Sequence, residues 1–256
     1  MKKISLKIKN SNLYFYDKTF NKNNDFLIST NTKQLDYHIL IFLDSRGFSL
    51  KSKKNLIDFF KKKFKKKKYL IISRPLEMTT WASLINFLKL NQHIKYKYLI
   101  TNMGFNDFTP KKKKFALNVK RQVSLFLEKK TKIEYLEKYT DKKNIKINLY
   151  NVNYGKNFID NLNSNLPSKK LILINTPPLK KKITFTTRAR PNSFFKMIKA
   201  TIKFNKKIKT LSTINFLTFD NFDTYDGVHY TDFGYTKIFK SINKLIFLKK
   251  LIFSFP

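Results

Sequence analysis

The chain has 256 residues, 42% of them hydrophobic, so it can form one domain with its own core, and wholesale disorder is excluded. It contains no cysteine, which excludes disulfides, thiolate zinc sites and cysteine nucleophiles together. The formal net charge is +38, but arginine supplies only 5 of the 54 basic residues. We interpret the lysine surplus as solvated surface with weak, salt-sensitive attraction to polyanions, rather than as a dedicated nucleic-acid site.

In chain order, residues 1–9 are basic but lack the apolar run of a signal peptide. No later stretch approaches the ~20 apolar residues of a membrane helix, so we expect a cytoplasmic protein with no membrane span. Residues 1–35 carry short alternating stretches, which predict short strands in an otherwise irregular N-terminal lead-in. These stretches are Ile4–Ile8, Leu13–Tyr16 and Phe26–Ser29.

From residue 36 to residue 256 the pattern predicts a second unit, in which apolar runs of strand length alternate with longer stretches of helical periodicity. The predicted strands are His38–Leu43, Tyr69–Ile72, Tyr98–Thr101, Ile145–Tyr150 and Leu171–Ile174, with a further extended run at Thr213–Phe219. The predicted helices lie in 56–64, 81–88, parts of 115–140, 156–163, 193–204 and 231–248. This alternation is typical of α/β proteins, and we expect a three-layer α/β/α sandwich with a mainly parallel five-stranded sheet.

Polar residues stand directly after the predicted strands. Asp44-Ser45-Arg46-Gly47 follows the first strand, and Gly104-Phe105-Asn106-Asp107 follows the third after Asn102-Met103. A third group, Asp226-Gly227-Val228-His229, comes just before the last helix. Ligands of such sheets bind beyond the carboxyl ends of the strands, so the sequence predicts a site there.

These residue types suffice for acyl transfer. The hydroxyl of Ser45 becomes a good nucleophile when an imidazole accepts its proton, and His229 can serve as that base. Asp226 lies three residues before His229 and can hold its other ring nitrogen. The backbone N–H of Ser45 and the side-chain amide of Asn106 can stabilise the developing oxyanion.

The order and context of these groups resemble the SGNH (GDSL-type) hydrolases. The resemblance covers residues 38–248, although about twenty positions carry it. Asn175-Thr176-Pro177-Pro178 after the fifth strand is similar to a proline-containing turn of that family. The resemblance implies a flavodoxin-like SGNH fold, the triad Ser45, Asp226 and His229, and an oxyanion hole formed by Ser45, Gly104 and Asn106.

Two positions depart from the family pattern. Leu43 stands where the family usually has a glycine before Asp-Ser. The stretch Ser73–Thr80 contains no glycine, although a glycine N–H of that block usually joins the oxyanion hole. A backbone N–H of Glu77 or Met78 would have to take its place.

Each of these residues also has an ordinary structural interpretation. Ser45 can cap a helix or form a turn, Asn106 and Asp107 can cap a helix, and Asp226-Gly227 is a common turn signal. Their joint order on one predicted rim favours catalysis. The other histidines, His38 and His93, have no such context, and the spacing of the aspartates between 220 and 232 matches no calcium loop. We therefore expect no metal and no cofactor.

Four of the five arginines gather near the same rim. Arg46 and Arg74 follow the first two strands, and Arg188 and Arg190 lie in the long loop after the fifth. They are either ordinary surface residues or a clamp for an acidic substrate, such as a carboxylated sugar or a phosphate.

The sequence thus predicts a serine esterase or deacylase that acts through an acyl-enzyme. The expected substrate is an O-acylated carbohydrate or a similar small ester. The alternatives are an O-acyltransferase of the same fold, or a weakly active or inactive relative that binds glycan or nucleic acid. The oligomeric state is left open.

Overall fold

The structure is a computed structural model. It describes residues 3–8, 11–16, 26–29, 36–47, 56–63, 68–73, 79–127, 129–140, 144–178, 192–215, 224 and 229–252.

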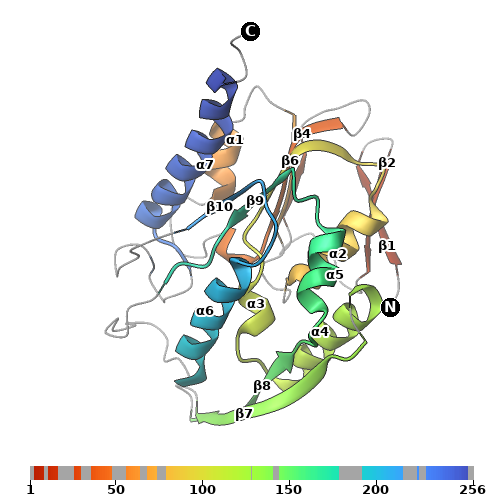
Figure 1. The fold of residues 1–256 in the computed structure, drawn as a ribbon, viewed down its shortest axis with the longest axis vertical. Coiled ribbons are helices and arrows are strands. Elements are labelled where there is room, and N and C mark those ends of the chain that lie inside the picture. The colour runs from red at the N-terminus through yellow and green to blue at the C-terminus, as the bar shows by residue number, and fades with distance from the viewer. Residues whose placement is uncertain are drawn as a thin grey trace.

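A sheet of six strands forms the centre of the molecule (Figure 1). Across the sheet the order is β10 (Ser212–Ile214), β9 (Leu171–Ile174), β6 (Lys95–Thr101), β4 (Asp36–Leu43), β5 (Tyr69–Ser73) and β3 (Phe26–Ser29). The first five are parallel, and β3 pairs antiparallel with β5. In chain order the parallel strands are arranged 2-1-3-4-5, which is the flavodoxin-like order. The predicted fold class, with a mainly parallel five-stranded sheet, is confirmed.

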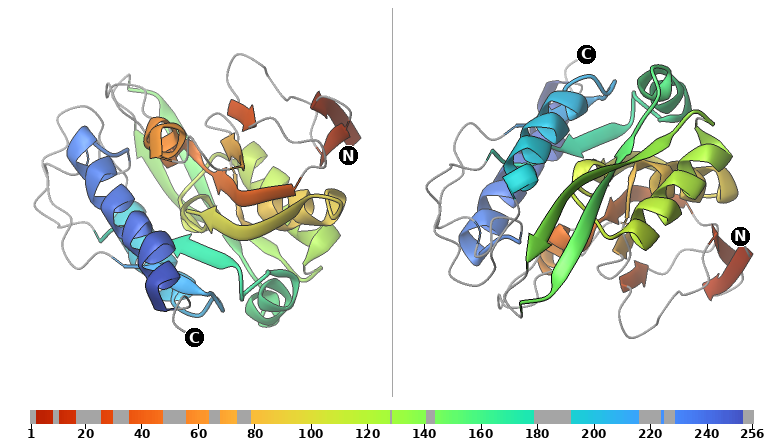
Figure 2. Two further views of the ribbon diagram at one scale, coloured as in Figure 1. Left: turned by 90° about the horizontal axis from the view of Figure 1, so that it is seen from above. Right: turned by 90° about the horizontal axis from the view of Figure 1, so that it is seen from below.

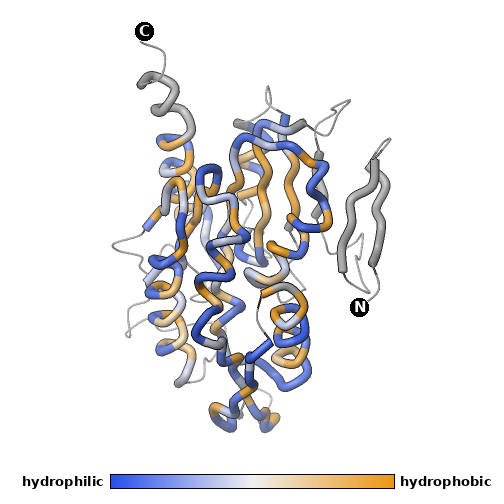
Figure 3. Tube along the Cα trace, turned by 45° about the vertical axis from the view of Figure 1, so that its right-hand side comes forward, coloured by the Kyte–Doolittle hydropathy of each residue, from blue (hydrophilic) through white to orange (hydrophobic). Residues whose placement is uncertain are grey.

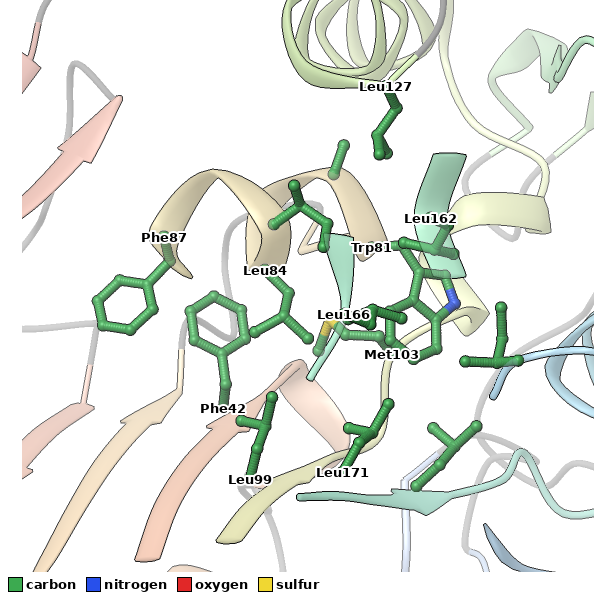
Figure 4. Close-up of a cluster of buried hydrophobic side chains, with 14 of the residues drawn as sticks. Phe42, Trp81, Leu84, Phe87, Leu99, Met103, Leu127, Leu162, Leu166 and Leu171 are labelled. Atoms are coloured by element: carbon green, nitrogen blue, oxygen red, sulfur yellow. The ribbon is translucent and has the colours of Figure 1, made fainter. Parts of the chain in front are cut away.

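The central strands are apolar on both faces because helices cover each face. Leu40 and Phe42 of β4 pack in one cluster with α2 (Trp81–Leu90), α4 (Lys113–Phe126) and α5 (Phe158–Asn165). Ile39, Ile41 and Leu43 pack in a second cluster with α1 (Leu56–Lys63) and α7 (Asp232–Ile252). Successive side chains of a strand point to opposite faces, so one apolar strand supplies both clusters. Figure 3 shows the strands as orange tubes among bluer segments, and Figure 4 shows the first cluster around Trp81.

Two helices lie beyond the carboxyl ends of the strands. The short α3 (Phe105–Phe108) follows β6 after three residues, and α6 (Asn192–Asn205) packs against it. Phe105 contacts Phe194 and Ile198 in a small apolar cluster of its own. Helix α6 therefore fixes the loop after β6 from outside the sheet.

The chain also forms two antiparallel hairpins apart from the central sheet. One consists of β1 (Lys3–Ile8) and β2 (Ser11–Tyr16), and the other of β7 (Lys132–Thr140) and β8 (Lys146–Asn153). Seen from below, the second hairpin runs across the molecule beside α4 (Figure 2). Both hairpins are separate two-stranded sheets among the described residues.

The second hairpin corrects two predictions. Residues 145–150 were expected in the central sheet, and 115–140 as loop and helix, but 132–140 and 146–153 pair with each other instead. The fifth parallel strand is β10, which begins at Ser212 and overlaps the start of the run predicted at Thr213–Phe219, of which 216–219 lie outside the described residues. The strands of the hairpin consist mainly of exposed and half-buried residues, with only Leu149 and Val152 of β8 buried, whereas β9 is buried throughout. Strands with this much exposed surface suit a two-stranded hairpin with one face in solvent.

The other predicted elements agree with the structure within a few residues. The short strands expected before residue 36 are present as β1, β2 and β3, and β3 joins the central sheet. The last helix, α7, contains most of the span predicted for it. Over the described residues, no helix combines the length and the hydropathy needed to cross a bilayer.

Candidate active site

The topological switch point of the sheet lies between β4 and β6. The sheet starts at β4, extends to β5 on one side and continues through β6 on the other, so the connections leave β4 and β6 in opposite directions. At such a switch point the loops after the two strands separate, and ligands bind between them. Ser45 follows one of these strands, and Gly104 and Asn106 follow the other.

The turn that carries Ser45 is held from both sides. Ser45 begins the 3₁₀ turn η1 (Ser45–Gly47), and Gly47 donates its N–H to the carbonyl of Asp44 at 3.0 Å. The N–H of Asp44 donates to Oδ1 of Asn102 at 2.9 Å, and Nδ2 of Asn102 donates to Oδ1 of Asp44 at 2.9 Å. This pair of bonds ties the end of β4 to the end of β6. Ser45 itself is half-buried, whereas Asp44, Arg46 and Gly47 on either side are buried.

Gly47 is the residue that lets this turn stay tight. A Cβ at this position would lie 2.7 Å from Cβ of Leu43, closer than side chains pack. The side chain of Leu43 therefore packs directly against Gly47, four residues later in the chain.

Arg46 lies beneath the rim, with 1% of its surface exposed. Its guanidinium pairs with Asp44 at 2.8 Å, donates to Oγ1 of Thr176 at 3.0 Å and also reaches the carbonyl oxygen of Asn102. The guanidinium also lies 4.7 Å from the centre of the Phe105 ring. Burial is the largest single influence and lowers the pKa of Arg46, but the interactions with Asp44 and Tyr230 together outweigh burial and hold the pKa above its usual range. These contacts join the loops after β4, β6 and β9, and they favour a structural role for Arg46 over the predicted contact with substrate.

The loop after β6 turns at Gly104 in a backbone conformation that few other residues adopt. Gly104 has a φ of 106°, in the left-handed region, where glycine is favoured. A Cβ on Gly104 would also lie 2.8 Å from Nδ2 of Asn205. The side chain of Asn106, 9% exposed, donates from Nδ2 to the carbonyl of Thr79 at 3.0 Å. An amide nitrogen carries two N–H bonds, so Asn106 has a second one to offer an oxyanion.

Asn205 holds this loop from helix α6. Its Nδ2 donates to the carbonyl of Met103 and to Oδ1 of Asn175, both at 3.1 Å. Its Oδ1 accepts from the indole N–H of Trp81 at 3.4 Å. Asn205 is fully buried, and its amide thereby joins the loops after β6 and β9 to the start of α2.

Asp107 links the loop after β6 to the start of α2. Both its carboxylate oxygens lie 3.2 Å from the N–H of Trp81, and Oδ1 accepts from the hydroxyl of Tyr154 at 3.3 Å. Burial raises the pKa of Asp107 to about 7, against the opposing effects of the Trp81 N–H, the Lys111 charge and Tyr154. Burial also lowers the pKa of Lys111 to about 8, and its ammonium donates to the carbonyl of Thr109 at 2.6 Å. Asp107, for which helix capping was one interpretation from the sequence, thus accepts from the first N–H of α2 and not from its own helix α3.

The start of α7 is bonded to the Ser45 turn. The hydroxyl of Tyr235 donates to the carbonyl of Arg46 at 3.1 Å. Tyr230 packs edge-on against Tyr235 with ring centres 5.4 Å apart, and its backbone bridges to Thr224. Burial raises the pKa of Tyr230 to about 12, although the positive charge of Arg46 acts in the other direction. Tyr230, which directly follows His229 in the chain, therefore lies beside Arg46.

Two of the predicted groups follow neighbouring parallel strands: Ser45 comes after β4, and Gly104 and Asn106 come after β6. The start of α7, just after His229, is bonded to the Ser45 turn through Tyr235. His229 is half-buried. The remaining predicted site residues, Asp226, Arg74, Arg188 and Arg190, lie outside the described residues, as do Glu77 and Met78.

Sequence reasoning gave no role to Asn102, Thr176, Asn205 and Tyr235, which hold the site together. Asn102 and Thr176 follow buried strands directly, and that position alone marks them as candidates. Asn205 and Tyr235 lie on helices, where no local pattern sets them apart. Among the described residues, no cluster of three or more His, Cys, Asp or Glu side chains could hold a metal ion.

Comparison with known proteins gave likenesses to solved structures only. No protein-family model and no curated protein matches the sequence. The chain is similar to a lipase/acylhydrolase from Enterococcus faecalis, with 17% identity, 81% of this chain and 94% of that chain covered, and a TM-score of 0.43. It is also similar to Est1E from Butyrivibrio proteoclasticus, with 8% identity, 98% and 99% of the two chains covered, and a TM-score of 0.38. The fold assignment therefore rests on the strand order and layers of this chain itself.

Proposed function

We propose that the protein is a serine esterase or deacylase of the SGNH type, acting through an acyl-enzyme on an O-acylated carbohydrate or a similar small ester. The observation that carries the proposal is the position of Ser45. It is half-buried, two residues after the end of β4 at the switch point, on a turn bonded to both the β6 loop and helix α7. A serine on a turn held in this way can keep its hydroxyl aimed at a bound ester.

The proposed reaction has two steps. The hydroxyl oxygen of Ser45 attacks the ester carbonyl while His229 accepts the hydroxyl proton, and Asp226 stabilises the imidazolium that forms. The N–H groups of Ser45 and Gly104 and the amide of Asn106 stabilise the oxyanion. His229 then gives its proton to the departing alcohol, which leaves Ser45 acylated. Water, activated by the same imidazole, hydrolyses the acyl-enzyme and restores the free hydroxyl.

The test uses a fluorophosphonate probe and a short-chain aryl ester. Ser45→Ala and His229→Ala should each abolish labelling and turnover, and the double variant should be hardly worse than either single one, since the two residues act as a unit. Asp226→Asn should keep more residual activity. Ser164→Ala and His93→Ala, at exposed positions, are the matched controls and should behave as wild type.

Full turnover by Ser45→Ala would show that the nucleophile is assigned to the wrong residue. Wild-type protein that neither takes the probe nor cleaves the ester would leave the binding-protein alternative in its place. Acyl transfer to a sugar hydroxyl in preference to water would identify an O-acyltransferase.

We further propose that Arg74, Arg188 and Arg190 favour acidic substrates. Arg46 is left out because its guanidinium is committed to Asp44 and Thr176. Alanine at each of the three positions should raise KM for an anionic ester and spare a neutral one. Equal losses on both esters would contradict the clamp.

A further inference from the structure

The outer face of helix α4 combines positive charge with exposed leucine side chains. Its basic residues, with the residue just before it, are Lys112, Lys113, Lys114, Lys120 and Arg121, and the stretch 112–127 contains no Asp or Glu. None of these five forms an ion pair with a carboxylate in the part of the chain that the structure describes. Four of them, Lys112, Lys113, Lys114 and Arg121, are exposed to solvent, and Lys120 is half-buried.

The same face carries two leucines that the core does not use. Leu117 and Leu125 are 40% and 56% exposed, whereas Ala116, Val119 and Val123 of the same helix are fully buried against the sheet. Leu117, Arg121 and Leu125 are spaced by four residues, so they lie on one side of the helix.

This side of α4 is hollowed. A depression of about 460 Å³ is lined by Leu117, Lys120, Arg121, Ser124 and Leu125. It places two cations and a hydroxyl between two aliphatic side chains, so the apolar and the charged contacts fall within one patch.

We propose that this face of α4 docks the protein on an anionic lipid bilayer, with the helix in the plane of the interface. A lipid phosphate or carboxylate would lie against Lys120 and Arg121, while Leu117 and Leu125 would enter the boundary between headgroups and acyl chains. The net charge of +38 draws the whole molecule toward such a surface.

The leucines are what favour a membrane over a nucleic acid. A phosphate backbone satisfies the cations but offers no apolar partner to the two exposed leucines on either side of them. Nucleic-acid surfaces that bind unpaired bases use aromatic side chains for that purpose, and this face presents leucines instead.

The test is sedimentation of the full chain with vesicles of phosphatidylcholine alone or mixed with phosphatidylserine. The protein should bind the mixed vesicles only, and less at higher salt. Lys120→Ser/Arg121→Ser should weaken that binding roughly 10- to 30-fold, the effect expected for two interfacial charges. Leu117→Ser/Leu125→Ser should weaken it by a similar factor.

Two matched controls separate the face from the overall charge. Lys206→Ser/Lys207→Ser removes the same charge from exposed positions just after α6, and Phe233→Ser removes an exposed apolar side chain from α7. Both should bind vesicles nearly as wild type does. Circular dichroism is expected to show that all variants fold, because none of the substituted side chains is buried.

Equal losses for the Lys120/Arg121 and Lys206/Lys207 variants would overturn the proposal, since the attraction would then be spread over the whole surface. Unchanged vesicle binding by the leucine variant would also overturn it. A single-stranded RNA probe supplies the third arm. If RNA binding needs Lys120 and Arg121 while vesicle binding does not, the face binds nucleic acid and the membrane proposal fails.

Discussion

Asn106 uses one of its two N–H bonds to hold the carbonyl of Thr79 at 3.0 Å, and the other is the one proposed for the oxyanion. Asn106→Ala should lower kcat by on the order of 100- to 1000-fold, the usual cost of one oxyanion donor. The KM should change little, because the donor acts mainly on the transition state. Steady-state kinetics on the aryl ester measure both quantities.

The control is Asn163→Ala, which removes an amide that donates to a main-chain carbonyl far from the rim. It should leave both constants unchanged. An Asn106→Ala variant with wild-type kcat would remove Asn106 from the oxyanion hole and leave it as a tether of Thr79.

Asp107 should make stability depend on pH, because burial raises its pKa from 3.8 to about 7. Between these values the folded protein keeps a proton that the unfolded chain releases. The free energy of unfolding should therefore fall as pH rises through this window, by at most about 1.4 kcal/mol per pH unit. Urea unfolding at a series of pH values measures the slope, and Asp107→Asn should remove it.

Lys111 should make the free energy of unfolding depend on pH in the opposite direction, and over a higher pH range than Asp107. Its pKa falls from 10.5 to about 8 in the folded protein, so between these values the unfolded chain holds the extra proton and stability rises with pH.

The matched control for the Asp107 experiment is the exposed Asp160, since Asp160→Asn should leave the slope between pH 3.8 and 7 as in wild type. A variant at Asp107 that keeps the wild-type slope would contradict the assignment.

At the scale of elements, Glu137 joins the β7–β8 hairpin to helix α6. Its Oε1 accepts from the N–H of Ser193 at 3.1 Å and from the hydroxyl of Ser193 at 2.6 Å, at the start of α6. A carboxylate there satisfies a helix donor and favours the helix dipole. Glu137→Ala should lower the free energy of unfolding by about 1 kcal/mol, and hydrogen exchange of the Ser193 amide should speed up.

Glu134 on the same strand is the control for that experiment. It accepts from Nδ2 of Asn153 at 2.7 Å across the hairpin and is exposed, so Glu134→Ala should cost less than about 0.5 kcal/mol. If both substitutions lower the free energy of unfolding equally, the contact of Glu137 with α6 contributes no more to stability than the exposed contact of Glu134.

The elements that sequence predicted well are those with an unambiguous period. The run Leu171–Ile174 is apolar at every position, as a strand buried on both faces requires, and the structure buries all of it. Residues 146–153 alternate instead, and that alternation indicates a half-exposed strand. Residues 145–150 were predicted to lie in the central sheet because of the length of this run and its place in the chain. Neither feature distinguishes a strand of a two-stranded hairpin from a strand of the central sheet.

At the scale of the whole molecule, the sequence located the edge of the sheet that carries the site but not the interactions that assemble it. Ser45 and Asn106 follow apolar strands, so topology alone places them on the same rim. The bond from Tyr235 to Arg46 spans 189 positions, and Asn205 reaches across 102 positions to Met103. Such contacts depend on how helices settle on the sheet, and no local pattern encodes them.

The whole chain contains a single tryptophan, and it stands at the floor of the candidate site. Trp81 is fully buried among apolar side chains (Figure 4). Its indole N–H donates to Asn205, and its backbone N–H donates to the carboxylate of Asp107. Tryptophan emission from the intact protein therefore originates from one point, next to the loop that carries Gly104 and Asn106. Its wavelength should titrate with a midpoint near pH 7 as Asp107 gains and loses charge, and should stay constant in Asp107→Asn. The protein thus carries a built-in optical reporter, through which occupancy of the rim can be followed without any label.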